Sequence, residues 1–242
     1  MNIILNGAKG RMGRIVDAAA AAGGHSVVAR VDFGYAGGEG LRTLDEYQGP
    51  ADVVIDFSNH VATAQVVDYC TKRGLPVVVA TTGQTEEELA LIDGAAKTVP
   101  VFLSANMSLG VALLADLAKK AAAVFPDADI EIIEKHHNQK LDVPSGTALL
   151  LARRIKETRP AAEFVIGRHE NGKRTKAEIG IHSLRLGNEV GVHEIIIATG
   201  SETITLKHEA ENRSLFAQGA LAAAAFIAGK APGMYEMRSI IE

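Results

Sequence analysis

The turn Gly7-Ala8-Lys9-Gly10-Arg11-Met12-Gly13 constrains the fold of this chain more than any other segment. It follows a short apolar run at residues 3–5 and opens an alanine-rich run at residues 11–22, which two glycines end. In this context, glycines allow a tight turn, close approach of the backbone to a pyrophosphate, and close packing of a helix on a strand. The spacing GxxGxxG is less common than GxGxxG, so dinucleotide binding needs a second supporting feature.

Asp32 supplies that feature. A β-type run at residues 26–31 ends directly before it, nineteen residues after Gly13, where a carboxylate can accept hydrogen bonds from an adenosine ribose. A carboxylate favours the free 2′-hydroxyl of NAD and repels a 2′-phosphate, and Phe33 adds no positive charge. Since Lys9 and Arg11 could still reach a phosphate, we expect NADH to be favoured, with NADPH left open. The alternative is a glycine-rich turn followed by a solvated aspartate.

The first half of the chain alternates short apolar runs with helix-compatible runs. The expected strands lie at residues 53–55, 77–79 and 101–103, and the expected helices at 61–72 and 86–97. Continuous apolar strands separated by helices are typical of a parallel sheet covered on both faces. Right-handed crossovers then give a doubly wound, Rossmann-type α/β sheet. The turns at residues 56–58 and 80–83 follow strands, at the edge where such sheets bind ligands.

After residue 107 the pattern changes to strands with few helices, which indicates a second α+β domain with a mixed, mostly antiparallel sheet. The expected helices are 109–125 and 147–157, and the expected strands are 130–135, 179–184, 192–198 and 203–207. A nearly all-apolar helix at residues 216–227 must be buried, and we place it on the first domain. We expect a dinucleotide-binding domain of residues 1–107 plus 217–242, and a substrate-binding and oligomerisation domain of residues 108–216.

The densest chemical signal is the stretch EKHHNQKLDVPSGT at residues 134–147. Two histidines and a lysine follow a strand, and a helix then begins with Ser145 or Thr147 as its N-cap and with exposed N–H groups at Gly146. A helix start can bind a carboxylate, while the loop holds titratable donors nearby. A solvated loop before an ordinary cap is the alternative. We expect no metal, because adjacent histidines cannot both ligate easily and no third ligand has suitable spacing.

Composition argues against several classes of function. The 242 residues carry a formal net charge of −4, whereas nucleic-acid-binding domains usually have a basic excess, so we expect no nucleic acid partner. No apolar run approaches the roughly 20 residues that span a bilayer, and no basic segment precedes an apolar one as in a signal peptide. Cys70 is the single cysteine, so no internal disulfide can form. We expect a cytoplasmic protein without a membrane partner.

Motifs along the whole chain resemble those of the 4-hydroxy-tetrahydrodipicolinate reductase (dihydrodipicolinate reductase) family. They are GAKGRMGR, VVIDFS, ATTG, SANMSLG, EKHHNQKLDVPSGTA, NRSLFAQGAL and GMYEMRSII. The HHxxKxDxPSGTA block is highly specific, whereas many dehydrogenases share the glycine turn. The resemblance implies reduction of a cyclic dicarboxylate, 4-hydroxy-tetrahydrodipicolinate, by NADH or NADPH in the diaminopimelate route to lysine. It also implies a homotetramer in which the second domains join their sheets.

The resemblance further implies roles for individual residues. His136 matches the family's proton donor or acceptor, and Lys140 its proton donor. The matching substrate-binding positions are His137, Gly146 and Thr147. The matching cofactor-binding positions are Gly7, Ala8, Lys9, Gly10, Arg11 and Met12 for the pyrophosphate, Asp32 for the ribose, and Ala80, Thr81, Thr82, Ser104, Ala105, Asn106 and Met107 beside the nicotinamide. Three positions depart from the family pattern: Ala80 and Leu186 replace usual glycines, and Met107 replaces a common aromatic residue.

Two other functions fit parts of the sequence. One is a dehydrogenase with a cysteine nucleophile, but Cys70 lies in the expected helix 61–72 and is better explained as a small buried residue. The other is a nicotinamide-binding sensor that keeps the fold without catalysis. A sensor needs no loop that binds a dicarboxylate, so the presence of this loop argues against a sensor. The remaining histidines show no clear ligand spacing, and we expect His182 and His193 to be structural or interface residues.

Overall fold

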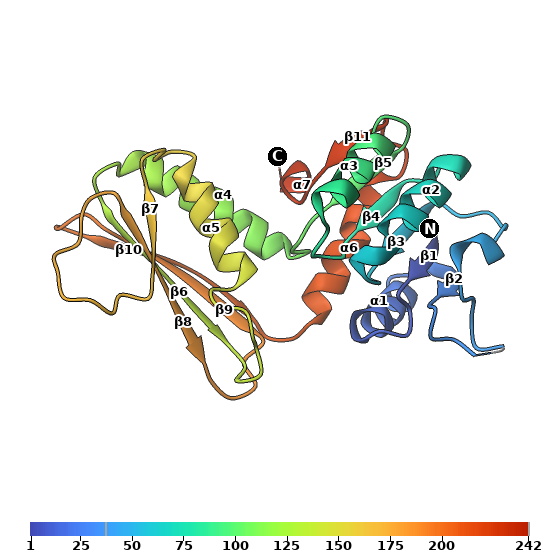
Figure 1. The fold of residues 1–242 in the computed structure, drawn as a ribbon, viewed down its shortest axis with the longest axis horizontal. Helices are drawn as coiled ribbons and strands as arrows, with labels where there is room; N and C mark the ends of the chain where they lie inside the picture. Colours follow the sequence, from blue (N-terminus) through green and yellow to red (C-terminus); the bar gives the residue numbers. More distant parts are fainter. Residues whose placement is uncertain (37, 242) are drawn as a thin grey trace. The chain divides into compact units, whose positions relative to one another are not determined.

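The computed structural model describes residues 1–36 and 38–241, and the chain forms two compact units (Figure 1). The first unit comprises Met1–Ser108 and Arg213–Glu242, and the second comprises Leu109–Asn212. The chain therefore leaves the first unit, forms the second, and then returns. In the two described ranges, no helix has both the length and the apolar composition that a bilayer-crossing segment needs.

The described part of the first unit contains a six-stranded sheet in the order β11-β5-β4-β3-β1-β2, with all neighbouring pairs parallel. Its strands are β1 (Asn2–Asn6), β2 (Ser26–Val31), β3 (Val53–Asp56), β4 (Val77–Val79), β5 (Pro100–Leu103) and β11 (Gly233–Tyr235). The central strands are continuous apolar runs because helices cover both of their faces. The chain passes from β1 to β2 and then crosses to β3 on the other side of β1. The switch point at which such sheets bind ligands thus lies between β1 and β3.

Helices cover the two faces of this sheet in pairs (Figure 1). α1 (Arg11–Ala22) packs against α6 (Ser214–Ile227), and α2 (Thr63–Arg73) packs against α3 (Glu86–Ala95). The short helices of the unit are η1 (Leu44–Glu46), η2 (His60–Ala62) and α7 (Arg238–Ile241). α6 comes very close to the chain before the second unit, since a Cβ at Gly219 would lie 1.6 Å from the Met107 carbonyl oxygen.

The second unit contains a five-stranded sheet in the order β10-β9-β6-β8-β7. Its strands are β6 (Asp129–His136), β7 (Glu163–Ile166), β8 (Glu178–Arg185), β9 (Gly191–Ala198) and β10 (Thr203–Ala210). The helices α4 (Leu109–Val124) and α5 (Gly146–Lys156) pack together over one face of the sheet (Figure 1). Isoleucines at alternate positions of the central strands face these helices and form the core, as the two-residue period of a strand requires.

The structure confirms the doubly wound parallel sheet and the second α+β unit with a mixed sheet. The expectation that the second sheet is mostly antiparallel is wrong. β6·β8 and β8·β7 pair in parallel, whereas β10·β9 and β9·β6 pair antiparallel. Parallel neighbours need crossovers: the segment with α5 carries the chain from β6 back to the start of β7, and residues 167–177 carry it from β7 back to the start of β8.

Two strands were not expected from the sequence. β7 and β11 lie at sheet edges, are short, and have no fully buried residue. β7 contains the apolar run Phe164-Val165-Ile166, which was not expected to form a strand, whereas β11 contains only Met234 and Tyr235.

Candidate active site

The glycine turn joins β1 to α1 and leaves no room for side chains at two of its glycines. Gly7 has a φ of 80°, and a Cβ there would lie 2.5 Å from the carbonyl oxygen of Phe57. A Cβ at Gly13 would lie 2.1 Å from the carbonyl oxygen of Gly7. Gly10 is the N-cap of α1. In the described chain no side chain caps this helix, and the first turn of α1 carries no acidic residue. The bare backbone and the N–H groups at this helix start fit the pyrophosphate of a dinucleotide.

Asp32 lies beside this turn at the carboxyl end of β2. Its carboxylate accepts hydrogen bonds from the backbone N–H groups of Lys9 at 3.0 Å and Gly34 at 2.9 Å. The glycine turn and the loop after β2 therefore fix this carboxylate in place. The Lys9 ammonium donates to the carbonyl oxygen of Gly34 at 2.7 Å and lies 5.6 Å from the centroid of the Tyr35 ring. Lys9 thus stabilises the loop that follows Asp32.

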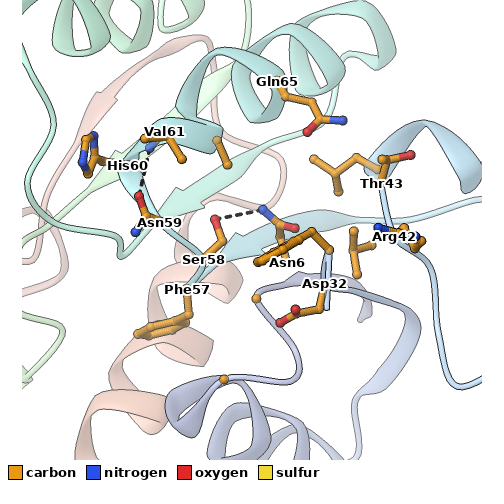
Figure 2. Close-up of a pocket in the computed structure, with 16 residues that line it drawn as sticks. Asn6, Asp32, Arg42, Thr43, Phe57, Ser58, Asn59, His60, Val61 and Gln65 are labelled. Carbon is orange, nitrogen blue, oxygen red and sulfur yellow. Dashed lines mark hydrogen bonds between the residues drawn. The ribbon is translucent and has the colours of Figure 1, made fainter. Parts of the chain in front are cut away.

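A cavity of about 740 Å³ opens at the switch point, within the size range of small-molecule and cofactor sites (Figure 2). Of the expected cofactor residues, Gly7, Gly10 and Asp32 line this cavity. Its other lining residues are Asn6, Val31, Phe33, Arg42, Thr43, Leu44, Phe57, Ser58, Asn59, His60, Val61, Ala62 and Gln65. Because the cavity adjoins both the glycine turn and the carboxylate after β2, it fits the adenosine half of a dinucleotide.

Asp56 joins the carboxyl ends of three strands, β1, β3 and β4. Its buried carboxylate accepts hydrogen bonds from the Ser58 hydroxyl at 2.5 Å and from Asn6 Nδ2 and the Thr81 hydroxyl, each at 2.8 Å. Asn6 ends β1, Asp56 ends β3 and Thr81 follows β4. Burial raises the pKa of Asp56, and these hydrogen bonds oppose the rise. The network therefore fixes the edge of the sheet on which a nucleotide would lie.

The expected nicotinamide-side residues continue along this edge, and they do not line the cavity. Residues 80–82 follow β4, and the N–H of Ala80 donates to the carbonyl oxygen of Asp56 at 3.0 Å. Residues 104–107 follow β5, and the Ser104 hydroxyl donates to the carbonyl oxygen of Asn106 at 2.7 Å. Both segments thus lie at the carboxyl ends of neighbouring strands, β4 and β5.

In the second unit, His136 ends β6 and begins the loop that leads to α5. The N–H of Leu186 donates to the carbonyl oxygen of His136 at 2.9 Å. The N–H of His137 donates to the carbonyl oxygen of Glu189 at 2.8 Å. These bonds fasten the start of the loop to the turn between β8 and β9.

Glu134, two residues before His136, lies at the centre of a buried network. Its fully buried carboxylate accepts hydrogen bonds from His136 Nδ1 at 2.5 Å, from the Ser145 N–H at 3.2 Å and from two Arg185 nitrogens at 2.8 Å each. Burial alone would raise the pKa of Glu134, but the hydrogen bonds from His136 and Arg185 lower it well below its ordinary value. The ionised carboxylate therefore joins His136 to the start of α5.

Ser145, rather than Thr147, is the N-cap of α5, and its hydroxyl oxygen accepts the N–H of Ala148 at 3.1 Å. The same oxygen lies 3.0 Å from Nε2 of His193 on β9. Burial lowers the pKa of His193 to about 3, and the nearby His136 adds to this effect, so His193 is neutral. Its ring contacts the His136 ring edge to face, with centroids 5.2 Å apart.

The remaining expected substrate residues lie at the solvent side of this network. Lys140 Nζ lies 2.8 Å from Asp142 Oδ1, and Asp142 also accepts a hydrogen bond from Arg185 through its carbonyl oxygen at 2.7 Å. Gly146 is exposed, and a Cβ there would meet nothing within 4 Å. The loop thus presents an ammonium group and an open helix start, both of which attract carboxylates.

Comparison with known proteins covers both units. Residues 1–107 match the family described as "Dihydrodipicolinate reductase, N-terminus", and residues 110–241 match "Dihydrodipicolinate reductase, C-terminus". The chain belongs to the dihydrodipicolinate reductase family.

Relatives of the same name are similar over their whole length. A 4-hydroxy-tetrahydrodipicolinate reductase of Caldanaerobacter subterraneus subsp. tengcongensis is 44% identical, with 100% of this chain and 98% of that protein covered. The one of Clostridium tetani is 45% identical, covering 98% of this chain and 95% of that protein. Among solved structures, a dipicolinate-bound dihydrodipicolinate reductase from Paenisporosarcina sp. TG-14 is 25% identical. It has a TM-score of 0.81 and covers 98% of this chain and 97% of that one.

Three members of the buried network in this dihydrodipicolinate reductase family chain were not among the expected site residues. Glu134 stands in a quoted motif without an assigned role, the sequence assigns no role to Arg185, and it predicts a structural or interface role for His193. The pairing of His136 with Arg185 across β6 and β8 brings the arginine to the loop, and it depends on strand register. Glu134 and His136 are two residues apart, and this spacing in a strand predicts that their side chains lie on one face.

The alternative with a cysteine nucleophile finds no support in this family member. Cys70 is buried on α2, and burial raises the pKa of its thiol. A thiol of this kind is inert as a nucleophile, because the thiolate is the reactive form. Within the described residues, no group of three or more His, Cys, Asp or Glu side chains is arranged to hold a metal ion.

Proposed function

We propose that this protein reduces 4-hydroxy-tetrahydrodipicolinate to tetrahydrodipicolinate with NADH or NADPH, in the diaminopimelate route of lysine biosynthesis. Membership of the dihydrodipicolinate reductase family over both units supports this proposal. Relatives at 44% and 45% identity carry the name of this reductase. A similar solved structure holds dipicolinate, a cyclic dicarboxylate.

The observation that carries the proposal is the network around Glu134. One carboxylate contacts both His136 Nδ1, at 2.5 Å, and the Ser145 N–H, at 3.2 Å. A titratable imidazole and the open start of α5 are therefore held close together in the second unit. Reduction of an unsaturated dicarboxylate needs a proton source beside a site for anions, and this arrangement offers both.

We assign recognition of the substrate carboxylates to His137, Lys140, Gly146 and Thr147. The N–H groups at the start of α5 and the Lys140 ammonium are donors suited to carboxylates, and each charge-assisted hydrogen bond contributes roughly 1.5–3 kcal/mol. Lys140 pairs with the exposed Asp142 at 2.8 Å in this structure. A substrate carboxylate would take the place of Asp142 as its partner.

We assign proton transfer to His136, with Lys140 as a second donor. A bound nicotinamide supplies the hydride to an unsaturated ring carbon, which leaves the protein to bind the substrate and to manage protons. The substrate must lose water, and the enamine that hydride addition leaves must be protonated. Both steps require groups near the ring that accept and release protons. His136 is suited to this, and such general acid–base catalysis contributes about 10²–10⁴-fold in rate.

For the cofactor we propose a preference for NADH that Asp32 sets, together with a weaker capacity for NADPH through Arg42. Val31 pairs in parallel with Leu41, so Asp32 and Arg42 follow next to each other at the carboxyl end of β2. Arg42 lines the same cavity as Asp32, and no other described residue accepts a hydrogen bond from its guanidinium. An arginine near the ribose can accommodate a 2′-phosphate, although Asp32 opposes one.

We also propose that the protein works as a homotetramer in the cytoplasm. The sheet of the second unit carries its helices on one face, where the half-buried Ile204 and Leu206 of β10 pack on the core, so the exposed residues that alternate with them lie on the other face. A face of this kind can join the sheet of another copy. Sedimentation velocity at low micromolar concentration is expected to give four times the mass of the chain, whereas a monomer would contradict the proposal.

The proposed activity is tested by a coupled assay. A synthase that condenses pyruvate with aspartate semialdehyde generates the unstable substrate, and the loss of NADH and of NADPH absorbance is followed separately. We expect both cofactors to be oxidised only when the substrate is generated, and NADH faster than NADPH at equal concentration. Nucleotide binding without turnover of either cofactor would favour a nicotinamide-binding sensor instead.

A further inference from the structure

We propose that Glu134 is a positioning residue. Together with Arg185, it holds His136 in one tautomer and one orientation, with the proton on Nδ1 and with Nε2 left for the substrate. The inference rests on the proposed function for the role of His136 in the reaction. Its geometry, however, lies wholly within the second unit.

Both carboxylate oxygens of Glu134 accept two hydrogen bonds each. Oε2 accepts from His136 Nδ1 at 2.5 Å and from Arg185 Nη1 at 2.8 Å. Oε1 accepts from Arg185 Nη2 at 2.8 Å and from the Ser145 N–H at 3.2 Å. An ionised carboxylate has about four acceptor sites and no proton to donate. His136 must therefore donate through Nδ1, which fixes its neutral tautomer and leaves Nε2 as the acceptor.

Glu134 and His136 are two residues apart on β6, so their side chains leave the same face of the sheet. Arg185 on β8 is the direct partner of His136 in the parallel pairing. Register alone thus brings the carboxylate, the imidazole and the guanidinium together. Carbonyl oxygens of Leu184 and Asp142 accept further Arg185 hydrogen bonds at 2.8 and 2.7 Å, which holds the guanidinium in place.

A carboxylate that is fully buried needs a cationic partner or several donors. Arg185 supplies the cation through two parallel hydrogen bonds, the strong geometry for a guanidinium and a carboxylate. Arg185 therefore balances the charge of the Glu134 carboxylate.

The other ring nitrogen of His136, Nε2, lies beside Gly191. In residues 1–36 and 38–241, no side chain or backbone group hydrogen-bonds to this nitrogen of His136. A Cβ at Gly191 on β9 would lie 3.1 Å from it, so a glycine there keeps that side uncrowded. The neutral His193 packs edge to face on the same ring at 5.2 Å. Nδ1 is anchored in the protein, and Nε2 is the nitrogen that remains available.

The matched variants are Glu134→Gln and Glu131→Gln. Glu131 lies on the same strand, accepts a hydrogen bond from His182 Nε2 at 2.8 Å and pairs with Arg174 at 3.4 Å. Each variant therefore removes one carboxylate charge from β6 beside a histidine and an arginine. Only Glu134 contacts the proposed catalytic imidazole.

Two readouts separate positioning from simple stabilisation. Nitrogen-15 NMR of labelled protein at neutral pH, with His136→Gln to assign the signal, reports which ring nitrogen carries the proton. We expect Nδ1–H alone in the wild type and in Glu131→Gln, and a mixture of tautomers in Glu134→Gln. We also expect Glu134→Gln to lower kcat at least about tenfold with the KM for the dicarboxylate within about threefold, and Glu134→Asp to recover part of kcat.

An unchanged tautomer and an unchanged kcat in Glu134→Gln would overturn the inference, and so would an equal loss of kcat in Glu131→Gln. If Glu134→Gln does not fold, Arg185→Lys serves in its place, since lysine cannot donate the two parallel hydrogen bonds. That variant must also give mixed tautomers. A wild type that reduces no dicarboxylate would refute the proposed function, whereas the NMR measurement tests the positioning of His136 without any turnover.

Discussion

At the scale of single residues, polar groups of the second unit divide into those that are fixed and those that are open. Glu134 and Ser145 are buried and hydrogen-bonded, while Lys140 pairs with an exposed aspartate and Gly146 faces open space. The fixed groups keep the side chains around them in one arrangement, and they cannot easily bind a new partner. The open groups can exchange solvent or Asp142 for a substrate carboxylate.

His136→Gln is expected to lower turnover about a hundredfold, because glutamine cannot exchange a proton near neutral pH. The affinity for NADH, measured by fluorescence titration, should stay near that of the wild type, since the nucleotide cavity lies in the first unit. His182→Gln, which changes a histidine of the same sheet that bonds to Glu131, serves as the control. Unchanged turnover in His136→Gln would remove this residue from the mechanism.

Arg42→Gln is expected to weaken binding of NADPH and of 2′,5′-ADP roughly tenfold, because it removes a charged donor for the 2′-phosphate. Binding of NADH and of 5′-AMP should not change. Isothermal titration with all four ligands measures the effect. Arg73→Gln would be a poor control because Arg73 holds the carbonyl oxygens of Tyr47 and Gly49, so the exposed Lys97→Gln is preferred. Equal weakening of all four ligands would contradict the assignment.

At the scale of secondary-structure elements, the junction of β9 and α5 depends on an uncharged histidine. The folded protein holds the pKa of His193 at about 3, while an unfolded chain has the ordinary value of 6.5. Below pH 6.5 the unfolded state therefore binds a proton at His193 that the folded state does not bind. The free energy of unfolding falls as the pH falls.

The expected loss from His193 between pH 7 and pH 5 is about 2 kcal/mol, or 1.36 kcal/mol for each pH unit below 6.5. Chemical denaturation at the two pH values should show that the free energy of unfolding falls more in the wild type than in His193→Gln, because glutamine does not titrate in this range. Comparison with that variant removes the contributions of the other groups. Equal declines in the two proteins would show that His193 is not buried in neutral form.

Most elements with strong local patterns were predictable from the sequence, and the contacts between them were not. The helix at 11–22 and the strands at 26–31 and 77–79 have the expected bounds, because glycines and unbroken apolar runs mark them. The Arg185 contact with Glu134 spans 51 residues and depends on the parallel pairing of β6 with β8. Local periodicity predicts which side chains of one strand share a face, but not which residues of a distant strand pair with them.

At the scale of the whole molecule, the two candidate sites lie in different units. The cavity at the switch point belongs to the first unit, and the network of Glu134 belongs to the second. Hydride transfer requires the nicotinamide and the dicarboxylate to meet, so binding at the two sites should be coupled. Enzymes of this kind commonly close around their ligands.

Coupling is measured by titrating a dicarboxylate substrate analogue, such as dipicolinate, with and without NADH. We expect NADH to increase the affinity for the analogue about five- to 150-fold, the usual range for coupled sites, and the analogue to increase the affinity for NADH by the same factor. Independent binding of the two ligands would argue against closure of the units on both ligands.

The proposed activity depends on hydride transfer to the cyclic dicarboxylate. The most direct measurement uses NADH that carries deuterium at the transferable position of C4, with mass spectrometry of the product. We expect tetrahydrodipicolinate that contains one deuterium in the presence of the wild type, and very little product with His136→Gln. Oxidation of the cofactor without deuterium in the product, or no reduced product at all, would contradict the account.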